Sequence, residues 1–90
     1  MSRWEETPKT MRLEVLSLGS GGLVLDGISE LKLMLADGSW LGILPGHAAL
    51  ISAVADGEIK YKQGGDEQRA AVKAGIMTLS HDLVSILTTH

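Results

Sequence analysis

The sequence predicts an all-β chain, an antiparallel β-sandwich of about nine to ten short strands. Two observations support this prediction. Residues that favour turns recur mostly every eight to twelve positions, and the segments between them alternate apolar with polar side chains, as strands do when they bury one face. This spacing leaves little room for long helices. The turn signals lie at residues 19–22, 26–27, 37–38, 45–46, 56–57, 64–66 and 81–82.

Each predicted strand lies between two of these turns. Period-two alternation is clearest at residues 11–15, 31–35 and 58–62, where every second side chain is directed to the same face. Shorter apolar segments predict the other strands. These segments are residues 23–25, 40–44, 50–54, 68–73, 76–79 and 83–88.

Residues 48–55 fit two kinds of element. Alanine favours helix, and Leu50, Ile51 and Val54 would share one helical face, so a two-turn helix is one possibility. A strand is the preferred interpretation, because Asp56 and Gly57 then form a natural turn into the next strand.

Ninety residues fit one domain. Residues 1–10 are polar and contain Pro8, which keeps the preceding residue extended, so we expect a flexible leader there. Residues 11–90 then form the β-sandwich domain. No apolar run approaches the roughly 18 residues of a membrane span, and we expect no direct membrane insertion.

The composition argues against binding to nucleic acid. The net charge is −3, the 8 lysine and arginine residues are scattered, and the aromatic residues are 2 tryptophans and 1 tyrosine. Few cations are therefore available for a phosphate backbone and few rings for stacking on bases. We expect no nucleic-acid partner, and a core built from aliphatic residues.

No set of residues predicts catalysis, a metal site or a cofactor. Cysteine is absent, and His47, His81 and His90 lack the spacing that places two imidazoles on one metal ion. The glycine-rich residues 19–22 lack the Lys-Ser/Thr pair of a phosphate-binding loop, so we interpret them as a hairpin turn. We predict a chain that is not itself an enzyme, with no small-molecule substrate.

Residues 33–44 predict an unusually apolar hairpin, interrupted only by the polar turn at residues 37–39. Met34 and one further pair, either Trp40 with Leu44 or Leu41 with Ile43, must face away from the core. This surface either contacts another protein or is covered within its own domain, and composition leaves both interpretations open.

The segment GILPGHA, at residues 42–48, resembles a signature of the epsilon subunit of F-type ATP synthases. The segments MRLEVLS, GLVLDGISELKLM and LVSILTT are similar to strands of its N-terminal domain, so that the resemblance covers residues 11–89. It implies a ten-stranded β-sandwich at the foot of the central stalk, in contact with the gamma subunit and the polar loops of the c-ring. The chain would help couple proton flow to rotation and ATP synthesis, while other subunits carry the catalytic sites. The implied location is the cytoplasmic face of a bacterial inner membrane.

Carried over by position, the resemblance assigns site residues. The motif residues are Gly42, Ile43, Leu44, Pro45, Gly46 and His47. The expected c-ring side consists of Gly38, Ser39 and Trp40, and the expected gamma side of Ser17, His47, Ala48, Ala49 and Leu50.

The sequence also departs from the family pattern. Trp40 stands where the family has glutamate, and Ala49 where it has proline. We expect a short form that lacks the family's C-terminal helical hairpin. The alternative function is a stand-alone ligand-binding β-sandwich of the same fold, in which Trp40 lines a pocket.

Overall fold

The computed structural model describes residues 9–17 and 22–88, and these residues form eight strands and no helix. The all-β class is therefore confirmed. Residues 1–8 of the predicted leader, most of the turn predicted at residues 19–22, and His90 lie outside the described residues. The strands are β1 (Met11–Ser17), β2 (Leu23–Met34), β3 (Trp40–Ile43), β4 (Leu50–Val54), β5 (Gly57–Gln63), β6 (Asp66–Val72), β7 (Gly75–Ser80) and β8 (Leu83–Thr88).

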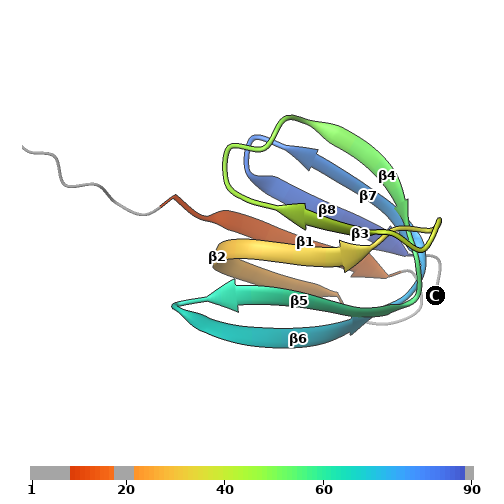
Figure 1. Cartoon of the computed structure of the whole chain (residues 1–90), viewed down its shortest axis with the longest axis horizontal. Helices are drawn as coiled ribbons and strands as arrows, with labels where there is room; N and C mark the ends of the chain where they lie inside the picture. Colours follow the sequence, from red (N-terminus) through yellow and green to blue (C-terminus); the bar gives the residue numbers. More distant parts are fainter. Residues whose placement is uncertain (1–8, 18–21, 89–90) are drawn as a thin grey trace, which may run out of the picture.

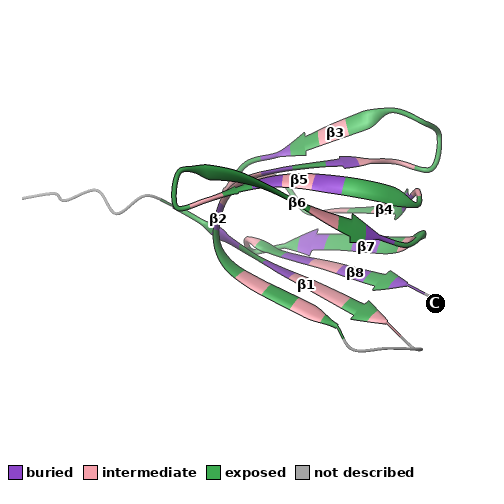
Figure 2. Cartoon of the chain, turned by 90° about the horizontal axis from the view of Figure 1, so that it is seen from below, coloured by how far each residue is buried: buried purple, intermediate pink, exposed green. Residues whose placement is uncertain are grey.

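The strands form one sheet that folds over into two layers (Figure 1). Its order is β4-β7-β8-β1-β2-β5-β6, and β3 also pairs with β2. Neighbouring strands are antiparallel except β1 and β8, which are parallel. The first layer contains β4, β7, β8, β1 and the first half of β2; the second contains β3, the second half of β2, β5 and β6. Figure 2 shows β2 curving from one layer to the other.

β2 is one strand of 12 residues, although the sequence predicts two strands separated by a turn at residues 26–27. Opposite β1, Met11 pairs with Ile28 and Leu13 with Leu25, so β2 has one extra residue at this point. Gly27 has a φ of 72°, which a glycine tolerates in a β-bulge. The Asp-Gly pair therefore bends the strand instead of reversing it, and this merger reduces the strand count to eight.

The core lies between the two layers and is mainly aliphatic, as the composition predicts. Leu13, Leu33, Ile43, Met77 and Ile86 are fully buried and come from five different strands. Ile43 is inside and its neighbours on β3 are more exposed, so the apolar hairpin has Trp40 and Leu44 on its outer side. This observation decides between the two alternations that the sequence allows.

Residues 50–54 form strand β4, as preferred from the sequence, and the helical alternative is wrong. β4 pairs along its whole length with β7. A bridge between Leu35 and Val54 then ties β4 to the end of β2, with backbone hydrogen bonds on both sides of it. One edge of the first layer is thereby joined to the second layer.

The sandwich has two ends, which we name after residues that lie there. Leu35 is bridged to Val54, Val54 pairs with Gly75, Gly75 with Thr88, and Thr88 with Ser17, so all five lie at the Trp40 end. The opposite, His47 end contains the turns at residues 45–46, 64–65 and 81–82. In Figure 1 the Trp40 end is on the right and the His47 end on the left.

Candidate functional site

The turn before Trp40 is held by Asp37. Its Oδ1 accepts hydrogen bonds from the backbone N–H of Ser39 at 2.9 Å and from the Ser39 hydroxyl at 2.6 Å. These two bonds lower the pKa of the Asp37 carboxyl, since they stabilise its charged form. Gly38, with a φ of 90°, donates to Leu35 O at 2.9 Å. The turn is thus fixed locally, and it determines where β3 begins.

Trp40 begins β3 and is 51% exposed. Its indole does not fill the core; the ammonium of Lys60 on β5 lies 5.5 Å from the ring centroid. Leu44, after β3, is also exposed. The expected c-ring residues Gly38, Ser39 and Trp40 are therefore together at one end of the molecule, with a large apolar ring open to solvent. Their contact with a c-ring stays a prediction.

The Pro-Gly-His segment forms a tight turn. His47 N–H donates to Leu44 O at 3.1 Å, and Gly46 has a φ of 87°, as in a type II turn with proline at its second position. The turn is also held from outside, because Gly46 N–H donates to Asp82 Oδ1 at 2.7 Å. A loop between β3 and β4 is thereby fixed to the β7–β8 turn, a contact that the sequence did not predict.

His47 is half-buried and contacts its own loop. Its Nδ1 lies 2.7 Å from Ala48 O, a hydrogen bond when that nitrogen carries the ring proton. Ala48 and Ala49 are exposed, while Leu50 packs against the core. The loop therefore presents small side chains to solvent on a backbone held by the turn.

Ser17 does not lie beside His47, although the resemblance assigns both to the gamma side. Ser17 is the last residue of β1 and lies at the Trp40 end. The His47 turn is held by Asp82, whose backbone carbonyl accepts a hydrogen bond from Arg12 N–H near the start of β1. The five residue steps from position 12 to position 17 span roughly 17 Å at about 3.3 Å per step. One partner could contact both only along the length of the sandwich.

An apolar surface lies on the outer face of the first layer, next to the Trp40 end. Its central row runs across four neighbouring strands, from Ala53 on β4 through Ile76 and Leu87 to Leu16 on β1. Ile51, which is 75% exposed, and Val24 belong to the next row toward the His47 end, where Thr78, Ser85 and Glu14 lie between them. We call this surface, made of Leu16, Val24, Ile51, Ala53, Ile76 and Leu87, the aliphatic face.

Sequence reasoning missed the aliphatic face. The signal was present, because β7 and β8 have apolar residues at both odd and even positions. Such a pattern is equally typical of a strand buried on both faces. In this chain Met77 and Ile86 point to the core while Ile76 and Leu87 point outward, and among the described residues no second layer covers them. A contiguous exposed apolar surface of this kind is typical of a protein-docking site.

Among residues 9–17 and 22–88, no three histidine or acidic residues cluster as metal ligands would. Within the same residues, no helix is long and apolar enough to cross a membrane.

Comparison with known proteins identifies a family. Residues 10–90 match the model of "ATP synthase, Delta/Epsilon chain, beta-sandwich domain". The ATP synthase epsilon chain of Solibacter usitatus is 34% identical over 80 residues, which are 89% of this chain and 58% of that protein. The epsilon chain of Bacillus velezensis is 32% identical over 79 residues, 88% of this chain and 58% of the relative. The chain thus spans a little over half the length of these relatives.

Solved structures agree on the fold. A chain of the Euglena gracilis mitochondrial ATP synthase, solved as an OSCP, F1 and c-ring assembly, superposes with a TM-score of 0.77 at 17% identity, covering 96% of this chain and 54% of the other. A chain of the central stalk and c-ring of the Tetrahymena thermophila mitochondrial enzyme gives a TM-score of 0.67 at 14% identity, with coverage of 93% and 67%.

Proposed function

The chain belongs to the family of the ATP synthase delta/epsilon chain β-sandwich domain, and from this premise we propose that it works as a central-stalk rotor subunit of epsilon type. In this role it docks on gamma and on the c-ring and helps couple proton flow to rotation and ATP synthesis. It contributes no catalytic residue of its own. It is held at the cytoplasmic face of a bacterial inner membrane through its partners.

The aliphatic face is the observation that supports docking most directly. Leu16 and Ile51 belong to this face, and each is the chain neighbour of a residue expected on the gamma side, Ser17 and Leu50 respectively. The face therefore begins beside Ser17 and reaches the first residues of β4, which follow the His47 loop. We propose that gamma lies along it, so that one partner reaches both Ser17 and the His47 loop. The gain is burial of aliphatic area that is exposed in the free chain.

The proposed c-ring contact is the turn at Gly38 and Ser39 together with Trp40. The turn is fixed by Asp37 and the indole is half exposed, so a partner meets a preformed apolar projection with little ordering cost. Trp40 is the kind of residue that dominates interface energies, because it combines a large apolar surface with one polar N–H.

Co-purification with the cognate gamma subunit tests this function. We expect a complex with about one copy of each chain, and Leu87→Glu to weaken it at least about tenfold, because a charge would be buried against an apolar partner. Leu44→Glu is the matched control, since Leu44 is 57% exposed against 50% for Leu87 but lies outside the aliphatic face.

Two results would refute the proposal. The first is absence of gamma binding at tens of micromolar protein while the chain is folded. The second, which concerns the face alone, is equal weakening by Leu87→Glu and Leu44→Glu.

A further inference from the structure

A row of like charges crosses the outer face of the second layer. Lys32 on β2 pairs directly with Lys60 on β5, and Lys60 with Arg69 on β6. Like charges directly opposite each other destabilise a sheet. The two outer cations have carboxylate neighbours, Glu30 at 3.7 Å from Lys32 and Glu58 at 3.8 Å from Arg69. Lys60, the central one, pairs with no carboxylate of the described residues.

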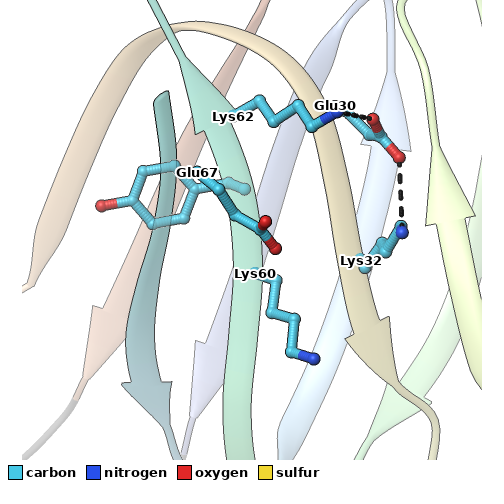
Figure 3. Close-up of a pocket in the computed structure, with 6 residues that line it drawn as sticks. Glu30, Lys32, Lys60, Lys62 and Glu67 are labelled. Atoms are coloured by element: carbon cyan, nitrogen blue, oxygen red, sulfur yellow. Dashed lines mark ion pairs between the residues drawn. The ribbon is translucent and has the colours of Figure 1, made fainter. Parts of the chain in front are cut away.

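Figure 3 shows the charged side chains around Lys60. Glu30 is shared by Lys32 and by Lys62, whose ammonium lies 3.4 Å away, while Lys60 extends away from it. The Lys60 ammonium lies over the indole of Trp40. The centre of the row thus has a cation without an ion-pair partner among the described residues, beside an aromatic ring.

A slot opens at this point because the row ends in a glycine. Gly42 on β3 pairs with Lys32, and a side chain at Gly42 would meet nothing within 4 Å. Trp40, two residues earlier on β3, lies to one side. The resulting depression is lined by Lys32, Trp40, Leu41, Gly42, Lys60 and Glu67. Its lining combines a bare backbone at the glycine, an aromatic side chain, two lysines and one glutamate.

The side chains indicate the chemistry of a ligand. Lysine acts as a compact point charge that suits phosphate, whereas paired recognition of a planar carboxylate favours arginine. The exposed indole offers a surface on which a second aromatic ring can stack. Glu67 adds one negative charge to the lining, which favours a single phosphate group over a polyphosphate.

We propose that this slot binds an aromatic monophosphate, with the phosphate on Lys60 beside Gly42 and the planar ring on Trp40. Glu30 already lies 3.7 Å from Lys32, so the phosphate supplies an anion chiefly to Lys60, and the glycine leaves room for it. The proposal goes beyond the rotor function and does not depend on it, since it concerns the isolated chain.

The test is an NMR titration of the 90-residue chain with adenosine monophosphate. We expect saturable shifts of the Trp40 indole N–H and the Gly42 amide, with a Kd near or below about 1 mM. Ribose 5-phosphate lacks the ring and adenosine lacks the phosphate, and each should bind at least about fivefold more weakly. Absence of saturable shifts at these two groups, or equal binding of all three probes, overturns the proposal.

Three variants distinguish binding in the slot from a general attraction of the phosphate to cations. Lys60→Gln should weaken binding of adenosine monophosphate at least about fivefold, and Lys73→Gln, which removes the same charge outside the slot, by no more than about twofold. Gly42→Val should fill the slot and abolish the shift at Trp40 while the other amide resonances keep their folded dispersion. Equal effects of the two lysine variants, or unchanged binding by Gly42→Val, contradict the proposal.

Discussion

Gly75 should be among the least replaceable residues of the domain, because its missing side chain allows β7 and β8 to approach. A Cβ added there would overlap the carbonyl oxygen of Leu87 and lie 2.8 Å from Leu87 C and 2.9 Å from Thr88 Cα. These are backbone atoms of a strand that is paired on both sides. Unlike a flexible side chain, they cannot move without disturbing two ladders of hydrogen bonds.

We therefore expect Gly75→Ala to lower the free energy of unfolding by about 3 kcal/mol, the upper part of the range for overpacked sites. For a domain of this size the same change lowers Tm by roughly 12 to 24 °C. Gly42→Ala is the matched control. It places the same methyl group in a strand where nothing lies within 4 Å. It should raise the free energy of unfolding by about 0.4 to 1 kcal/mol, because alanine leaves the unfolded chain fewer conformations than glycine does.

Urea unfolding followed by circular dichroism measures both variants, and an unchanged slope against urea shows that the two-state comparison is valid. If Gly75→Ala stays within about 0.5 kcal/mol of the parent chain, the close approach of β7 and β8 does not constrain this position. If Gly42→Ala loses as much stability as Gly75→Ala, the loss comes from replacing any strand glycine, and the steric reasoning is wrong.

Three further predictions concern the core, the exposed indole and the turn before it. Leu33→Ala should cost about 2 to 5 kcal/mol in urea unfolding, because Leu33 is fully buried; a loss below about 1 kcal/mol would contradict its place in the core. Trp40→Ala should leave Tm almost unchanged but weaken assembly on the c-ring in a reconstitution assay; unfolding of the variant, or unchanged assembly, would show that Trp40 is not an exposed contact. Because the pKa of Asp37 is lower in the folded chain than in the unfolded chain, its charged form should stabilise the fold. This contribution should be present at pH values above the Asp37 pKa of the unfolded chain, and should be lost as the pH falls through the Asp37 pKa of the folded chain. Asp37→Asn keeps a hydrogen-bond acceptor but cannot titrate, so it should lack this pH dependence in urea unfolding. An NMR titration of the parent chain should place the Asp37 pKa below its ordinary value of 3.8. A pKa at or above that value would refute the hydrogen bonding to Ser39.

The fold class could be predicted because the alternation of side chains is a local property of a strand. The strand β4 could be predicted for a similar reason, since Asp56 and Gly57 form a turn signal just after it. The break expected at residues 26–27 was wrong, because an Asp-Gly pair suits both a turn and a bulge. The pairing of Met11 with Ile28 shows that the strand continues, and only neighbouring strands supply that information.

The candidate site was predicted in part. The sequence placed Gly38, Ser39 and Trp40 in one turn, since they are adjacent in the chain, and the structure keeps them together. It could not separate Ser17 from His47 in space, because their positions depend on the parallel pairing of β1 with β8. It also could not identify the aliphatic face, since an outward apolar residue and a buried one look alike until the layers are known.

The sequence by itself determined the strand-forming segments, the aliphatic core and the family, because these rest on local pattern and on the GILPGHA segment. Only the tertiary structure decided which apolar side chains face outward, and that Lys32, Lys60 and Gly42 share one row beside Trp40. The physical reason is that both properties are set by pairing between strands distant in the chain, and a one-residue change of register would turn each of those side chains to the other face.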